Sequence, residues 1–110
     1  MATYLVHARY SPAAFQGMLT AAHDRGQAAK ALFKSLGIKT KEIMYSVTSG
    51  EVVCLLEATS AQLAEAQMIT MASGGFSEIH AQELISTKDM MAAMKNAGVK
   101  ASKYAAPNKK

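Results

Sequence analysis

The chain has one cysteine, two prolines and no tryptophan among its 110 residues. A single cysteine cannot form an intramolecular disulfide, so Cys54 excludes a disulfide-stapled scaffold and is typical of a reducing compartment. No uncharged apolar run reaches the roughly 18–20 residues of a membrane span. The N-terminal stretch MATYLVHARY also lacks the basic region of a secretory signal. We therefore expect a cytoplasmic protein with no membrane partner.

Positive charge is scarce outside the C-terminus, although the net charge is +4. Residues 95–110 carry five lysines and no acid, whereas residues 1–94 carry seven Lys or Arg and eight Asp or Glu. A nucleic-acid-binding surface usually combines a basic stripe with interleaved aromatic side chains on the folded body. Residues 1–94 show no such stripe, so we expect no nucleic-acid partner. We interpret residues 99–110 as a basic, polar, solvated tail.

What is present is the composition of one globular domain. Half of the residues are apolar and 18% are charged, which is enough to build a core without metals or disulfides. Alternation, helical spacing and turn residues predict these elements: a strand at 3–10, a helix at 12–36 with a break at His23-Asp24, strands at 38–48 and 51–59, a helix from Thr59 or Ser60 to Ser73, a strand at 76–86, and a short helix capped by Thr87 and ending near Gly98.

The order of these elements is β-α-β-β-α-β, followed by a C-terminal helix. This is the ferredoxin-like pattern, which predicts an α+β fold. The four strands should form an antiparallel sheet in the order 4-1-3-2, with both crossover helices on one face. We expect residues 1–98 to form this single domain.

Alternation along the strands divides the side chains between the two faces of the sheet. The more apolar set should face the helices, and it comprises Tyr4, Val6, Ala8, Val52, Cys54, Leu56, Ala58, Ser77, Ile79, Ala81 and Ile85. The opposite face should gather His7, Arg9, Glu57, His80 and Gln82, together with Leu5, Tyr45, Val53 and Leu55. Leu5, Val53 and Leu55 would leave a contiguous apolar patch exposed to water on this face, so we expect a second subunit to cover it.

Four segments of the chain carry a resemblance to a known family: YLVHARYSPAAFQGML, DRGQAAKALFKSLGIK, EVVCLLEA and TKDMMAAM. With the order and spacing of all elements over residues 2–95, they make the chain similar to the GYD-domain family. This family comprises small bacterial and archaeal proteins of uncertain function. The resemblance implies membership of the dimeric α+β barrel superfamily, in which two ferredoxin-like sheets pack face to face and ligands sit between sheet and helices.

The hallmark of that family is degenerate in this chain. When the chain is aligned on the Val-Val pair that follows, the Gly-x-Tyr-Asp stretch falls on Thr48, Ser49, Gly50 and Glu51. The glycine and the tyrosine are replaced and the aspartate becomes a glutamate, so no role of the tyrosine carries over. Gly50 is explained by the geometry of a hairpin turn.

The polar members of the second set are the candidate catalytic residues: His7, Arg9, Glu57 and His80. A histidine beside a carboxylate can act as a general base, so His7 or His80 would be the base and Glu57 its partner. Arg9 would hold an anionic substrate or intermediate. The candidate ligand-binding residues beside them are Tyr45, Leu55 and Gln82. The alternative is a polar network inside a dimer interface, whose members satisfy one another's hydrogen bonds.

Metal and cofactor signals are missing from the sequence. No pair of His, Cys, Asp or Glu has the spacing of a dedicated metal site, so we expect no metal and no cofactor. His23 could serve as a haem or metal ligand, but in AAHDRG it is better explained as a residue at the helix break.

Three functions are consistent with the sequence. The first is a GYD-type homo-oligomer that binds a small apolar ligand between sheet and helices. The second is an enzyme of the same superfamily, similar to its cofactor-free monooxygenases or isomerases. The third is a ligand-sensing regulatory module, which is weaker because no long loop joins the second and third strands.

Overall fold

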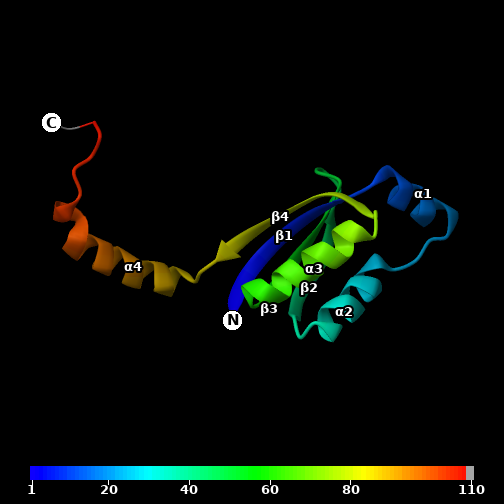
Figure 1. Ribbon diagram of the computed structural model, residues 1–110, viewed down its shortest axis with the longest axis horizontal. Helices are drawn as coiled ribbons and strands as arrows, with labels where there is room; N and C mark the ends of the chain where they lie inside the picture. The colour runs from blue at the N-terminus through cyan, green and yellow to red at the C-terminus, as the bar shows by residue number, and fades with distance from the viewer. Residues whose placement is uncertain (109–110) are drawn as a thin grey trace.

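The computed structural model describes residues 1–108, and its centre is an antiparallel sheet covered on one face by two helices (Figure 1). The strands are β1 (Ala2–Tyr10), β2 (Lys39–Ser46), β3 (Glu51–Ala58) and β4 (Phe76–Leu84). The helices are α1 (Pro12–Thr20), α2 (Arg25–Ser35), α3 (Ser60–Ala72) and α4 (Thr87–Lys100), followed by a short 3-10 helix, η1 (Ala101–Lys103). The strand order is β2-β3-β1-β4, which is 4-1-3-2 when counted from the β4 edge. The predicted ferredoxin-like class is confirmed.

The first crossover consists of two helices separated at the predicted break. The Ser11 hydroxyl accepts a hydrogen bond from the Ala14 N–H at 3.1 Å, and a proline stands at the start of α1. The Asp24 carboxylate caps α2 by accepting from the Gly26 N–H at 2.8 Å. Gly37 has a φ of 78°, a left-handed conformation that turns the chain from α2 into β2.

The second crossover begins with a capping box. The Thr59 hydroxyl accepts from the Gln62 N–H at 3.2 Å, and the Gln62 side chain accepts from the Thr59 N–H at 2.9 Å. These two bonds satisfy donors that would otherwise be unpaired at the start of α3. The Gln62 amide also donates to the Gly37 carbonyl at 3.3 Å, which connects α3 to the end of the first crossover.

The core lies between the sheet and α2 and α3, as the alternation predicted. Alternate residues of β1 and β3 are buried there: Tyr4, Val6, Ala8, Tyr10, Val52, Cys54, Leu56 and Ala58. Three of the four residues predicted for the core from the last strand are exposed: Ser77, Ala81 and Ile85, which is 60% exposed, although Ala81 still lies on the helix side. The pairing of β1 with β4 shifts between Arg9 and Tyr10, so Phe76 stacks on Tyr10 with ring centroids 5.1 Å apart. Ile85 lies beyond the end of β4.

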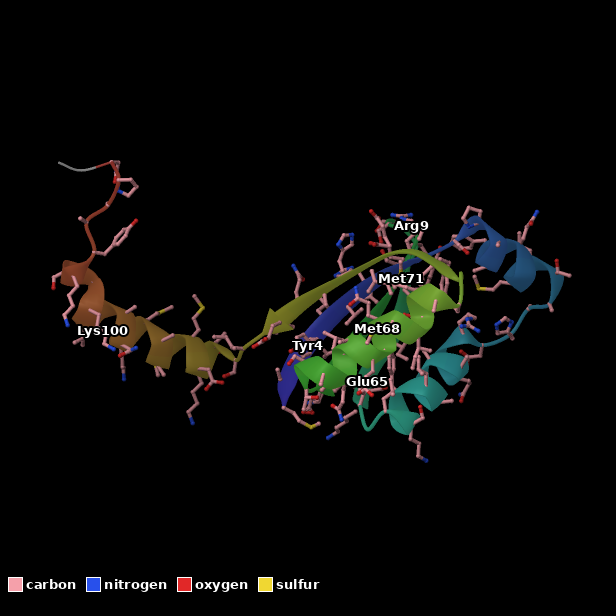
Figure 2. The ribbon with its side chains drawn as sticks, in the orientation of Figure 1. Tyr4, Arg9, Glu65, Met68, Met71 and Lys100 are labelled. Atoms are coloured by element: carbon pink, nitrogen blue, oxygen red, sulfur yellow. The ribbon has the colours of Figure 1, made fainter. Side chains whose placement is uncertain are left out.

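The C-terminal helix extends away from the rest of the molecule (Figure 1). Its N-cap is Ser86, which accepts from the Asp89 N–H at 3.0 Å, and not Thr87 as predicted. The helix also continues through Gly98 to Lys100, which lies far from the sheet (Figure 2). The radius of gyration is 18.5 Å, whereas a compact chain of this length is expected at about 13 Å. This difference reflects the projecting helix.

Candidate functional site

We define the open face as the side of the sheet opposite α2 and α3. Strand register arranges its side chains in rows that cross β2, β3, β1 and β4 in that order. The two central rows are Glu42, Leu55, Leu5, Gln82 and Met44, Val53, His7, His80. The row at the hairpin end is Ser46, Glu51, Arg9, Glu78. The face therefore has an apolar centre beside a charged end.

Three of the four predicted catalytic residues lie close together where the central row that contains His7 and His80 adjoins the charged end that contains Arg9. His7 is directly opposite His80, and Arg9 is directly opposite Glu78. The Glu78 carboxylate lies 3.9 Å from Arg9 Nε and 3.8 Å from His80 Nε2, while His7 Nδ1 lies 3.9 Å from the Glu51 carboxylate. We call these five residues the polar cluster: His7, Arg9, Glu51, Glu78 and His80.

Glu57 is not part of the polar cluster, which corrects the prediction that it is the carboxylate partner of His7 or His80. Its register partner on β1 is Thr3. Thr3 is four residues from His7, or about 13 Å along an extended strand. The Glu57 carboxylate instead faces Lys41 and Lys39, at 3.7 and 4.0 Å. The carboxylate that approaches His7 is Glu51, from the degenerate hallmark.

Tyr45 also lies elsewhere than predicted. A bulge between Thr40 and Glu42 shifts the alternation of β2, so Tyr45 pairs with Val52 and belongs to the helix side of the sheet. Its place on the open face is taken by Met44, which is 65% exposed. Leu55 and Gln82 do lie on the open face, on either side of Leu5.

The separations within the polar cluster limit its chemistry. Contacts that transfer protons are about 2.6–3.2 Å long, whereas these ion pairs measure 3.8–3.9 Å. The shortest contact of Arg9 is a hydrogen bond of 2.9 Å donated to the Ser49 carbonyl in the hairpin turn. Gly50 has a φ of 71°, and a Cβ there would lie 3.3 Å from the Arg9 guanidinium. In this arrangement Arg9 holds the hairpin turn against the sheet.

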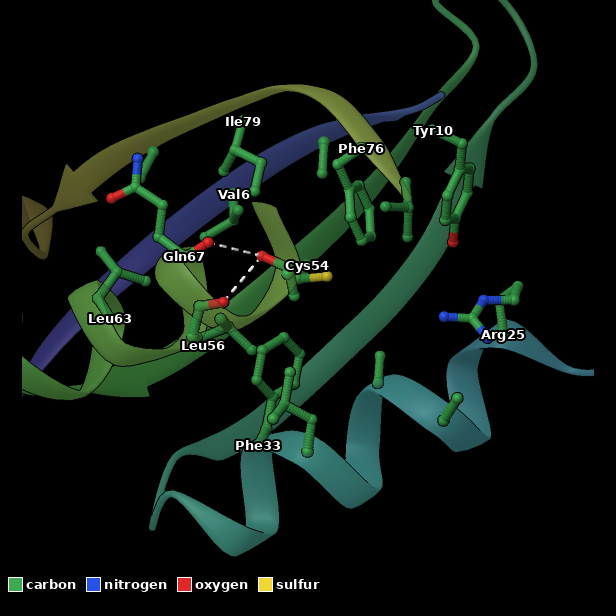
Figure 3. Close-up of a pocket in the computed structure, with 18 residues that line it drawn as sticks. Val6, Tyr10, Arg25, Phe33, Cys54, Leu56, Leu63, Gln67, Phe76 and Ile79 are labelled. Carbon is green, nitrogen blue, oxygen red and sulfur yellow. Dashed lines mark hydrogen bonds between the residues drawn. The ribbon is translucent and has the colours of Figure 1, made fainter. Parts of the chain in front are cut away.

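A cavity of about 170 Å³ lies on the other side of the sheet, between the strands and α2 and α3 (Figure 3). Its walls are almost entirely apolar, with Val6, Ala8, Cys54 and Ile79 from the sheet, Ala28, Ala29 and Phe33 from α2, and Leu63 and Ala66 from α3. The family resemblance implied a ligand position here, but the lining residues were not predicted. The signal for them is the set of alanines on the two helices, whose side chains are too short to fill the space.

The few polar groups of the cavity are already engaged or lie at one end. The Thr70 hydroxyl donates within α3 toward the Ala66 carbonyl, at 2.8 Å, and the Gln67 carbonyl, at 3.1 Å (Figure 3). Burial raises the pKa of the Cys54 thiol to about 11, so the thiol is neutral near pH 7. The other polar side chains of the lining are those of Gln67 on α3, and of Tyr10 and Arg25.

Tyr10 and Arg25 form the polar mouth of the cavity. The Tyr10 hydroxyl points toward the Arg25 side chain (Figure 3). Burial raises the pKa of the Tyr10 phenol, and the neighbouring Arg25 guanidinium acts in the opposite direction. The same two residues also line two adjoining hollows, of about 310 and 390 Å³, which His23 lines as well.

His23 orients the Arg25 side chain. Arg25 Nη1 lies 3.0 Å from His23 Nε2, and because a guanidinium can only donate, Nε2 must be the acceptor. His23 Nδ1 lies 2.8 Å from the Ala21 carbonyl and must then carry the proton. In this tautomer the imidazole connects the loop between α1 and α2 to Arg25. The sequence located the helix break at His23 without indicating this contact.

Residues 1–108 contain neither a cluster of metal-ligating side chains nor a membrane-spanning helix. Among residues 1–108, no group of three or more His, Cys, Asp or Glu side chains is arranged to hold a metal ion. Over the same residues, every helix is too short or too polar to span a lipid bilayer.

Comparisons with known proteins agree with this architecture. The family profile described as the GYD domain matches residues 4–94. Among solved structures, the chain is similar to the solution structure of the C-terminal domain of the MgtC protein from Mycobacterium tuberculosis, with a TM-score of 0.52 and 16% identity. That match covers 76% of this chain and 88% of the other, and at this identity it shows a shared fold alone. A search of curated proteins finds no match.

Proposed function

The chain belongs to the GYD domain family, and from this premise we propose that it is a homo-oligomeric protein that binds a small apolar ligand between its sheet and its helices. The observation that carries the proposal is the cavity of about 170 Å³. Its buried thiol also favours a reducing compartment, so we propose the cytoplasm as its location.

The size and lining of the cavity define the ligand. An apolar cavity of about 150 Å³ stays free of water and is large enough for benzene. The cavity here is slightly larger, and the one hydroxyl on α3 that faces it is engaged with its own helix. A ligand gains free energy there by leaving water, at about 25 cal/mol per Å² of apolar surface buried. We infer a ligand with an apolar part of about one aromatic ring.

The open face supports the homo-oligomeric part of the proposal. Leu5, Val53 and Leu55 stand side by side at its centre and are half-buried without any helix above them. Contiguous apolar surface of this kind marks a protein interface. A second copy of the chain placed against this face would enclose the polar cluster, which then becomes the hydrogen-bonded network of an interface.

The C-terminal helix gives a second reason to expect self-association. Every residue of α4 is exposed, including Met90, Met91 and Met94, which are 51, 50 and 58% exposed. Three methionines within two helical turns form an adaptable apolar surface. The helix therefore offers a partner copy an apolar surface.

A matched pair of variants tests ligand binding. We expect toluene, titrated into ¹⁵N-labelled protein, to shift the amide resonances of Ala28, Ala66 and Ile79. Ala28→Leu places a larger side chain into the cavity and should abolish these shifts. Ala31→Leu adds the same atoms to the same helix away from the cavity, and it should leave them intact. Shifts that are absent in the wild type, or that persist in Ala28→Leu, would contradict the cavity as the binding site.

A further inference from the structure

Arg25 is placed where it can contact both the cavity and the solvent. It is the first residue of α2, it is half-buried, and it lines the cavity and both adjoining hollows. The remainder of the cavity lining is almost wholly apolar. A permanently charged side chain at the edge of an apolar space is costly to desolvate unless it has a compensating partner.

The partners of Arg25 within the protein are neutral. Among residues 1–108, none of the ion pairs within 4 Å includes Arg25. The adjacent carboxylate, Asp24, is engaged with the backbone N–H groups of Gly26 and Gln27. A guanidinium has five N–H donors, and the contact with His23 uses one of them. Donors remain that can bind an anion at the cavity mouth.

Tyr10 supplies a second donor at the same place. Its ring is fixed between Phe76, with centroids 5.1 Å apart, and Phe15, with centroids 5.7 Å apart. Because burial raises the pKa of its phenol, the hydroxyl keeps its proton near pH 7 and can donate a hydrogen bond. A carboxylate at the mouth could therefore accept hydrogen bonds from the charged Arg25 guanidinium and from the neutral Tyr10 hydroxyl.

We propose that the ligand is a small apolar monocarboxylate, whose hydrocarbon part fills the cavity and whose carboxylate binds Arg25 and Tyr10 at the mouth. This inference rests on the proposed ligand-binding function of the cavity. Arginine and a carboxylate match in geometry through two parallel N–H···O bonds. His23 acts as a positioning residue, because its hydrogen bond engages Arg25 Nη1 and leaves other donors of the guanidinium for the mouth of the cavity.

Benzoate and benzamide test the inference, because they have the same size and shape and differ in charge. Because hydrogen bonds to a charged group are stronger than those to a neutral group, wild-type protein should bind benzoate at least about tenfold more tightly than benzamide in an NMR titration. Arg25→Gln should remove this preference, and Tyr10→Phe should reduce it. Lys30→Gln removes one positive charge from the same helix at an exposed position outside the cavity, and it should preserve the preference.

The outcomes separate this inference from the function on which it rests. Equal affinities for benzoate and benzamide, or a preference that survives Arg25→Gln, would overturn the carboxylate site while toluene binding still stands. If toluene, benzoate and benzamide all leave the cavity resonances unshifted, the ligand-binding function fails and the carboxylate site with it. A loss of preference in Lys30→Gln as large as that in Arg25→Gln would indicate attraction by the overall charge and would also overturn the site.

Discussion

The two faces of the sheet differ most clearly at two neighbouring residues of β3. Leu56 points toward the helices and is 1% exposed, whereas Leu55 points to the open face and is half-buried among other strand residues. Both are leucines in the same strand, so neither residue type nor strand propensity separates them. Helices α2 and α3 of the same chain pack on the helix face. The apolar residues of the open face are shielded from water only by their neighbours in the sheet.

Truncating each leucine should therefore have very different effects. Leu56→Ala leaves a void in a packed interior and should lower the free energy of unfolding by about 2–5 kcal/mol. Leu55→Ala should cost less than about 1.5 kcal/mol in dilute protein, because its surroundings can relax and solvent can enter. Urea denaturation followed by circular dichroism measures both values.

The destabilisation caused by Leu55→Ala and Leu56→Ala should depend differently on protein concentration. If copies of the chain associate through the open face, folding is linked to association and the cost of Leu55→Ala should grow as the concentration rises. The cost of Leu56→Ala should change much less, since its contacts lie within one chain. Leu19→Ala, at an 87% exposed position on α1, is the control for truncation of a solvated leucine. Costs for Leu55→Ala that stay constant from micromolar to millimolar protein would contradict an interface there.

Alkaline pH should weaken the helix face through Cys54. The thiol has an ordinary pKa of 9.0 and a folded-state pKa of about 11. Between these values the unfolded chain loses a proton that the folded chain retains, so the free energy of unfolding falls as the pH rises. The full fall should be about 2–3 kcal/mol between pH 9 and pH 11.

The control for this prediction is Cys54→Ala, and the quantity to compare is the slope of the free energy of unfolding against pH, not the free energy itself. Cys54→Ala removes the thiol and leaves a small void, so its stability is lower at every pH, but its slope between pH 9 and 11 should be shallower than that of the wild type. Burial also raises the pKa of Tyr10. This residue is present in both proteins, so its contribution to the difference between their pH slopes cancels. Parallel stability curves for the two proteins would show that the thiol is not buried as described.

The helix face could be predicted from the sequence because its information is local. A period of two in β1 and β3 identifies the buried set, and Thr59 followed by Gln62 marks the start of α3. Which residues lie opposite one another is not local information. Register depends on the hairpin and on bulges, and one bulge at Lys41 is enough to move Tyr45 to the other side of the sheet.

The candidate site was predicted less well for the same reason. The approach of His80 and Arg9 to Glu78, and of Glu51 to His7, follows from the pairing of three strands. Alternation alone could not distinguish Glu51 from Glu57, since both lie on the open face. The cavity depends on how far apart the helices pack, and Arg25 reaches it only because the chain breaks at His23 and begins a new helix.

The smallest predicted effect concerns the charged end of the open face. Arg9 and Glu78 are 3.9 Å apart, with side chains 44 and 58% exposed, so the pair is a solvated contact. Exposed ion pairs contribute about 0–1 kcal/mol, and Glu78→Gln should therefore lower the free energy of unfolding in dilute protein by less than about 0.5 kcal/mol. If a second copy covers the open face, as proposed, the same substitution should cost more at high protein concentration, because the covering subunit removes water from Arg9 after Arg9 has lost its ionic partner. A large cost in dilute protein would mean that this end of the sheet is already shielded within one chain.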